Sequence, residues 1–133
     1  MVKEFNSLEE IEKYYDENTN TYVFRENDRY IDLVKFNFDL NVNANIDVHD
    51  IIAWSINTHD IYACDIKVEE IIANDIYANK INAIVIKAYD ISYYALCFAY
   101  CSIKCKSIIG RRKNSKHFVF DGKLEVEENE KED

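Results

Sequence analysis

The sequence predicts an all-β solenoid, a short parallel β-helix. The prediction rests on a five-residue isoleucine period, on a small residue two places after most isoleucines and on a short polar residue before most of them. Isoleucine recurs every five residues at ten successive positions: Ile46, Ile51, Ile56, Ile61, Ile66, Ile71, Ile76, Ile81, Ile86 and Ile91. An α-helix would rotate the side chain by about 140° over five residues, and a flat strand would send alternate isoleucines to opposite faces. A chain that keeps all ten on one side must turn a corner in every repeat. Short uniform repeats that turn regularly stack as coils.

The composition of each repeat agrees with this prediction. The consensus is Asp-Ile-x-Ala-x, with a small residue two places after most isoleucines and a short polar or acidic residue before most of them. Positions i and i+2 of an extended segment point to the same side, so a large and a small apolar side chain face the core together. Asp and Asn suit corners because their side chains hydrogen-bond nearby backbone amides.

This repeat resembles that of the pentapeptide-repeat proteins in period and residue types over residues 46–95. The resemblance implies a right-handed β-helix with four pentads, or twenty residues, in each coil. In that family the small residue precedes the large one by two places, whereas here it follows the isoleucine by two. We therefore expect a related but non-identical β-helix.

Weaker copies of the pattern extend the expected coils over residues 31–110. Leu96 and Phe98 keep the isoleucine register, and Ile103 and Ile108 resume it after a slip of two residues, which a bulge or a wider corner would produce.

The two ends of the chain look different from the coils. In the entry segment 1–30, a capping-box pattern and an apolar stripe predict a helix over residues 7–17 that covers the first coil. Alternation around Asp121-Gly122 predicts a C-terminal hairpin over 111–126, which either caps the last coil or pairs with the hairpin of a partner. The acidic tail 127–133 is expected to be disordered.

Length and composition bound the remaining possibilities. The chain has 133 residues, of which 48% are hydrophobic, enough for one domain with a core. No apolar run reaches membrane-spanning length and no apolar signal region follows Met1, so we expect neither membrane contact nor export. The resemblance to pentapeptide-repeat proteins implies the cytoplasm of a bacterial or phage-infected cell.

Neither catalytic residues nor a cofactor are expected. The two glycines, Gly110 and Gly122, are too few for a phosphate-binding loop, and no nucleophile motif is present. The left-handed β-helices that transfer acyl groups repeat every six residues rather than five. The sequence therefore predicts a protein that is not an enzyme.

Four cysteines allow two interpretations, which are zinc thiolates or packing in the core or at a corner. They are Cys64, Cys97, Cys101 and Cys105. Their spacing does not give the paired ligands of structural zinc sites, and cysteine packs well as a small apolar residue, so we favour packing and no metal. His49 and His59 would lie half a turn apart in a twenty-residue coil, which argues against a joint metal site.

Charge is unevenly distributed along the chain. The net charge is −9, yet seven basic residues against Asp121 give +6 between residues 104 and 123, which leaves −15 for the rest. This basic segment could contact nucleic acid, or it could pair with the acidic tail or with acidic coils. Its candidate contact residues are Lys104, Lys106, Arg111, Arg112, Lys113 and Lys116.

Twenty-residue coils would create two neighbouring surface rows. Asp50, Glu70 and Asp90 would form an acidic column at the spacing of stacked strands. Beside it, Ile52, Trp54, Ile72 and Tyr94 would form an apolar interface. The N-terminal segment could cover that interface. Alternatively, the interface could bind a target or a second copy in a homodimer.

We therefore expect a protein that acts by binding protein. The leading hypothesis is inhibition of a nucleic-acid-handling protein through an acidic surface that imitates DNA. The resemblance supports it, since pentapeptide-repeat proteins include gyrase-protecting DNA mimics, and small acidic proteins are common among phage-encoded inhibitors such as anti-CRISPR proteins. The alternative is a self-assembling structural β-helix or phage structural component, and in either case we expect a homo-oligomer.

Overall fold

The registers of strand pairing set the length of one coil. In the computed structural model, which describes residues 1–127, Ile46 pairs with Ile61 and Ile61 pairs with Ile76, so equivalent residues lie fifteen apart. Three pentads therefore close one coil, and the prediction of twenty residues per coil is wrong. The pentad period requires one corner per repeat but does not determine how sharply the chain bends there.

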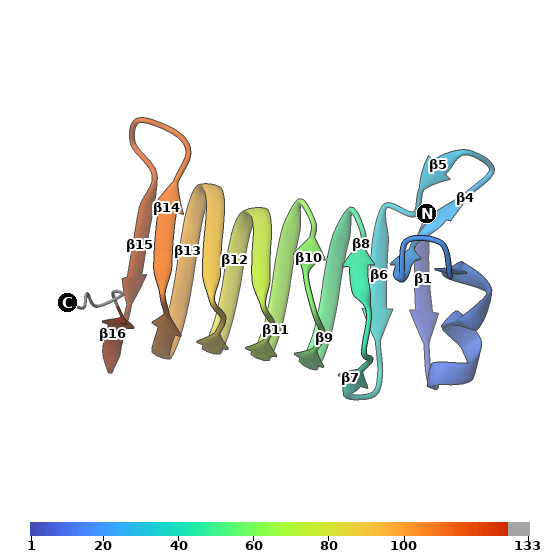
Figure 1. Cartoon of the computed structure of the whole chain (residues 1–133), viewed down its shortest axis with the longest axis horizontal. Coiled ribbons are helices and arrows are strands. Elements are labelled where there is room, and N and C mark those ends of the chain that lie inside the picture. The colour runs from blue at the N-terminus through green and yellow to red at the C-terminus, as the bar shows by residue number, and fades with distance from the viewer. Residues whose placement is uncertain (128–133) are drawn as a thin grey trace.

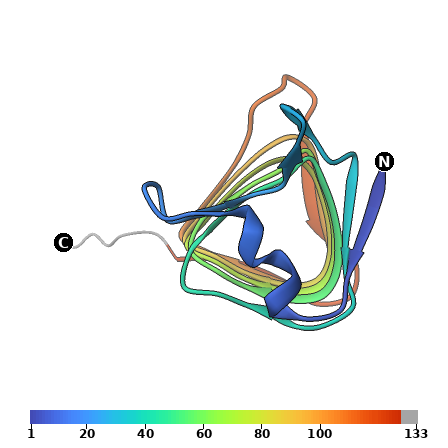
Figure 2. The same ribbon diagram turned by 90° about the vertical axis from the view of Figure 1, so that its right-hand side faces the viewer.

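The coils form a prism of triangular cross-section. Figure 1 shows about five turns stacked along the long axis, and Figure 2 shows the three sides seen from the N-terminal end. In that view the chain runs clockwise as it recedes, so the solenoid is right-handed. The prediction of a short all-β, right-handed parallel β-helix is confirmed.

Each side of the prism is a parallel sheet, and strands that turn a corner belong to two or three sides. The first face contains β3 (Thr21–Val23), β8 (Asn45–Asp47), β10 (Ile61–Tyr62), the starts of β12 (Asp75–Lys87) and β13 (Asp90–Cys105), and β14 (Ser107–Gly110). The second face contains β1 (Val2–Phe5), β6 (Leu33–Phe36), the starts of β9 (Asp50–Asn57) and β11 (Asp65–Ile72), the middle of β12 and β13, and β15 (Lys116–Val119). The third face contains β7 (Leu40–Asn41), the ends of β9, β11, β12 and β13, and β16 (Lys123–Val126).

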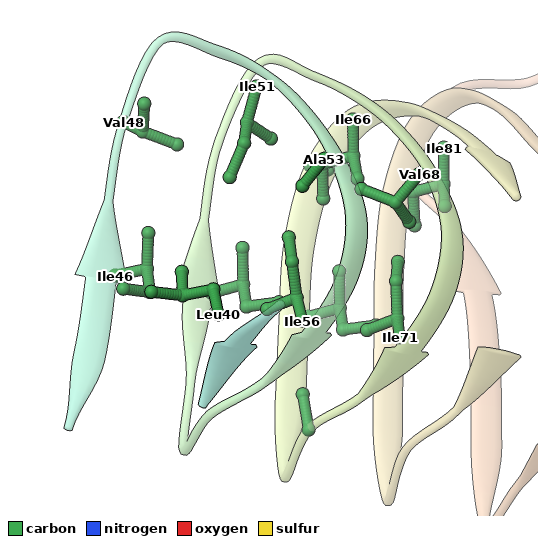
Figure 3. Packing of buried hydrophobic residues seen from close by; sticks show 14 of the residues in the cluster. Leu40, Ile46, Val48, Ile51, Ala53, Ile56, Ile66, Val68, Ile71 and Ile81 are labelled. Carbon is green, nitrogen blue, oxygen red and sulfur yellow. The ribbon is translucent and has the colours of Figure 1, made fainter. Parts of the chain in front are cut away.

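The isoleucine ladder forms the core. Every ladder isoleucine is at most 2% exposed, and the small residues two places on fill the space between them. Figure 3 shows these side chains stacked in rows toward the axis of the prism. Aromatic rings fill the N-terminal end, where Phe5, Phe24 and Phe36 contact one another.

Two corners of β13 hold the extra residues that the sequence pattern indicated. Ile76 pairs with Ile91, but Ile81 pairs with Cys97 and Ile86 with Ile103, so the offset grows from fifteen to sixteen to seventeen residues. Because the first extra residue precedes Leu96, Cys97 and Ala99 are buried in place of Leu96 and Phe98. The predicted slip exists, although it is divided between two corners and begins earlier than predicted.

A helix covers the N-terminal end of the solenoid, as predicted. It is a 3-10 helix, η1 (Leu8–Tyr14), which lies across the triangular opening in Figure 2. Its buried Ile11 and Tyr14 close the core, and the Tyr14 ring lies 5.6 Å from that of Phe5. The Ser7 side chain makes no capping hydrogen bond, whereas the backbone N–H of Asn6 donates to the Glu10 carboxylate.

The solenoid includes more of the N-terminal region than predicted. β1 pairs with β6 and β3 pairs with β8, so the coils begin within residues 1–30. The short β2 (Tyr15–Asp16) pairs antiparallel with β3, and β4 (Arg25–Glu26) with β5 (Arg29–Tyr30).

The predicted C-terminal hairpin is wrong. β15 and β16 both pair in parallel with β13, on the second and third faces, so they continue the coils to Val126. Asp121-Gly122 forms the corner between them. A Cβ atom on Gly122 would lie 1.7 Å from the carbonyl oxygen of Cys101, so only glycine fits this close backbone approach.

The described residues leave one end of the solenoid open. β14, β15 and β16 pair on one side only, with β13. Leu124 and Val126 pair with buried Ile103 and Cys105, yet they are 38% and 40% exposed. Residues 128–133, which hold most of the predicted acidic tail, lie outside the described residues. No helix within residues 1–127 has the length and apolar character needed to span a membrane.

Candidate functional site

The predicted acidic column does not exist, because fifteen-residue coils place its members at three different corners. Asp50 pairs with Asp65, Glu70 pairs with Ser55 and Val85, and Asp90 pairs with Asp75. Glu70 therefore lies between the second and third faces, whereas Asp50 and Asp90 begin the second and the first face.

A different acidic row runs along the corner between the third and first faces: Asn45, Asp60, Asp75 and Asp90. Side chains of this row link neighbouring coils. The N–H of Asp60 donates to Asn45 Oδ1 at 3.1 Å, and that of Asp75 donates to Asp60 Oδ1 at 3.2 Å. Burial raises the pKa of Asp75, and the neighbouring carboxylates of Asp60 and Asp90 raise it further. These residues therefore stabilise the corner through hydrogen bonds while repelling one another.

The predicted apolar interface is dispersed for the same reason. Ile52 lies on the second face, Ile72 on the third, and Tyr94 at the corner between the first and second faces. Arg112 lies over the Tyr94 ring at 5.3 Å. The N-terminal segment covers the end of the prism and leaves Trp54 60% exposed, so the four residues form neither a covered nor a shared surface.

Trp54 instead belongs to an exposed apolar surface that the sequence analysis missed. We call it the aromatic ridge, and it consists of Trp54, Ile84, Phe98, Tyr100, Phe118 and Phe120. It follows the corner between the second and third faces and the adjoining part of the second face. Phe118 and Phe120 are exposed, with Phe120 at 68%. The Tyr100 and Phe120 rings stack at 5.4 Å, and the Phe98 and Phe118 rings meet edge to face at 5.0 Å.

A shallow groove of about 490 Å³ runs along the aromatic ridge on the second face. Trp54, Ile84 and Tyr100 line it together with Ile52 and Phe98, and Lys67 and Glu69 supply its charges. The sequence does contain a signal for this grouping, since Trp54, Ile84 and Tyr100 are separated by thirty and sixteen residues. That signal has meaning only once the coil length is known.

The basic segment does not form one patch. Lys104 and Lys106 lie on the third face and the corner that follows it, whereas Arg111, Arg112 and Lys113 lie on the loop after β14, and Lys116 begins β15. Several of these residues contact the protein itself. The Arg111 guanidinium lies 3.9 Å from the centre of the Tyr77 ring and donates to Ser92 Oγ and to the carbonyl of Ala78. Lys104 pairs with Glu127 at 3.5 Å.

Two of the four cysteines pack in the core, as predicted. Cys97 and Cys105 are buried, and burial raises their pKa values to about 12 and about 11. Cys101 is exposed at the corner between the second and third faces, and Cys64 is half-buried at the corner between the first and second. The four thiols are therefore not brought together.

Cys64 lies beside His49 and Asp50 rather than beside the other three cysteines. It lies one coil after His49, and one ligand atom from each of His49, Asp50 and Cys64 lies within 4.8 Å of the other two. His59, in contrast, lies at another corner, where its Nε2 is 2.6 Å from Asn43 Oδ1.

Comparison with protein-family models, with curated proteins and with solved structures gave no match. These observations define the protein as a right-handed β-solenoid with an exposed aromatic ridge.

Proposed function

We propose that the protein is a non-catalytic binding module that holds a protein partner on the aromatic ridge. The observation that carries this proposal is the exposure of large aromatic side chains along one corner, with Trp54 60% and Phe120 68% exposed. Exposed apolar surface costs solubility, and Trp and Tyr dominate the binding energy of many interfaces. Within the ridge, the exposed Glu69 stands between Trp54 and Ile84. The stacked strands hold these rings in place, which lowers the entropy lost on binding.

Charge favours a basic partner. The net charge of −9 would attract a positively charged protein and would repel nucleic acid, which supports inhibition of a nucleic-acid-handling protein as the specific form of the proposal. The row of Asp60, Asp75 and Asp90 is the stacked carboxylate surface available for such attraction. The ridge then supplies the apolar contact, and the acidic surface increases the rate of encounter.

The test is affinity capture with matched variants, followed by calorimetry with the partner that is recovered. We expect Trp54→Ala/Tyr100→Ala to weaken binding at least tenfold, because both rings lose their apolar contact. Tyr62→Ala/Tyr89→Ala is the control, since these tyrosines are also exposed but lie away from the ridge. Equal loss in both double variants, or no loss in the ridge variant, would contradict the proposal.

A second candidate function is assembly through the open end, which is favoured by the edges of β14, β15 and β16 that have no partner strand within residues 1–127. Because η1 covers the other end, two copies would join C-terminal end to C-terminal end about a twofold axis, with their edge strands antiparallel. Such contact gives a closed homodimer rather than a filament.

Analytical ultracentrifugation tests this assembly. We expect a dimer that Leu124→Lys/Val126→Lys converts to monomer, whereas Leu8→Lys, at the capped end, leaves it intact. A parent protein that stays monomeric at all concentrations would exclude this candidate, and filaments would contradict the closed dimer.

A further inference from the structure

The corner between the first and second faces gathers three chemically different metal ligands. His49 and Asp50 are consecutive at this corner, directly before and at the start of β9, and Cys64 occupies the equivalent place one coil later. The His49 Nδ1 atom lies 3.1 Å from Asp50 Oδ1. The cluster joins residues fifteen apart, so it depends on the length of the coil.

Backbone contacts hold these residues in register. The N–H of Cys64 donates to the carbonyl oxygen of His49 at 2.7 Å, and the N–H of Asp65 donates to Asp50 Oδ1 at 3.2 Å. The ligand atoms lie within 4.8 Å of one another. Nitrogen, oxygen and sulfur ligands of a tetrahedral zinc ion are about 3.5 Å apart, so rotation of side chains alone can bring the three atoms to that spacing.

We propose that His49, Asp50 and Cys64 bind one divalent cation of the zinc class, with a fourth position left to water. An imidazole, a carboxylate and a thiolate together suit a borderline cation, whereas Ca²⁺ and Mg²⁺ favour oxygen ligands alone. When the cation binds, the Cys64 thiol releases its proton to solvent and the sulfur binds as thiolate. This site departs from the expectation that the chain holds no metal.

The local electrostatics also favour a cation. The carboxylates of Asp50 and Asp65 lie close to Cys64, so the site already carries negative charge. In residues 1–127, no lysine or arginine forms an ion pair with Asp50 or Asp65. A bound divalent cation would offset this charge and stabilise the thiolate.

Cobalt(II) titration of chelator-treated protein tests the proposal, because a cobalt–thiolate bond gives a charge-transfer band in the near ultraviolet. We expect the band to saturate at one equivalent and to disappear when zinc is added. Cys64→Ser should abolish the band, and His49→Ala should raise the dissociation constant at least tenfold.

Cys101→Ser is the matched control, since it removes an exposed thiol at a different corner. It should leave the titration unchanged, and circular dichroism should show that all three variants fold. Absence of the band in the parent protein would overturn the proposal. Persistence of the full band in Cys64→Ser, or its loss in Cys101→Ser, would also overturn it.

Discussion

Thr58 is an exception among the inward-facing residues of the coils. It is 5% exposed, and it is the one residue in the described chain with a buried side-chain oxygen that has no hydrogen-bond partner. Its place on the third face corresponds to Ala73 one coil later, since Ile56 pairs with Ile71. The buried hydroxyl has no partner, so its desolvation is not offset by a hydrogen bond.

Thr58→Val should therefore stabilise the protein. Valine keeps the shape and removes the unpaired hydroxyl, which we expect to raise the free energy of unfolding by about 1 kcal/mol and the melting temperature by a few degrees. Thr58→Ser keeps the hydroxyl and removes the methyl group, so it should lower the melting temperature. Thermal unfolding followed by circular dichroism measures both, and destabilisation by valine would contradict this account of the site.

Cys105 should make the fold sensitive to alkali. Its pKa rises from an ordinary value of 9.0 to about 11 in the folded protein. Between those two pH values the unfolded chain loses the proton that the folded chain keeps, so the free energy of unfolding falls as pH rises. Cys105→Ala, which places at this position the residue found at Ala88 one coil before, should lose less stability between pH 9 and pH 11. Parallel curves for parent and variant would contradict this prediction.

At the scale of the element, the side chains of each strand alternate between core and solvent. In β11, Ile71 is fully buried whereas the adjacent Ile72 is 37% exposed. Identical residues at neighbouring positions therefore contribute differently to stability, and the difference can be measured directly.

Ile71→Asp should unfold the domain, because it buries a charge among stacked apolar rows with no partner. Ile72→Asp should be tolerated, with a change in unfolding free energy within about 1 kcal/mol. Urea denaturation of the two variants provides the comparison. Equal damage from both variants, or greater damage from Ile72→Asp, would contradict the assignment of Ile71 to the core and Ile72 to the surface.

The sequence predicted the elements better than their arrangement. The isoleucine ladder identified the core and its parity, and the stripe over residues 7–17 identified the cap, because both depend on short-range periodicity. The coil length was wrong because identical pentads stack equally well in a triangle or a square. The errors in the acidic column and in the apolar interface follow from that one quantity, including the dispersed Asp50, Glu70 and Asp90 and the missed neighbours of Trp54. The hairpin was wrong because Asp121-Gly122 suits a solenoid corner as well as a tight turn.

At the scale of the whole molecule, the number of residues removed should decide which surfaces stay aligned. Deleting residues 66–80 removes one complete coil, joins Asp65 to Ile81 and keeps Trp54 in line with Ile84. Deleting residues 66–70 removes one pentad and preserves the ladder, but it rotates the later coils by one face, so Trp54 leaves the ridge.

Both deletions should fold, as judged by circular dichroism, because every pentad offers the same core residues. Only the fifteen-residue deletion should retain the binding attributed to the aromatic ridge. Failure of the fifteen-residue deletion to fold while the five-residue deletion folds would argue against three pentads per coil.

Because a coil closes after three pentads, the residues that maintain the fold and the residues that form each outer face can change separately. Mutations at fifteen-residue intervals accumulate along one face and leave the other two untouched, while the ladder that maintains the core is shared by all three. One face of the solenoid can therefore evolve a new binding specificity while the core residues that stabilise the fold stay unchanged. Duplication of a coil would lengthen all three surfaces at once, so the reach of the molecule and the chemistry of each side can evolve independently.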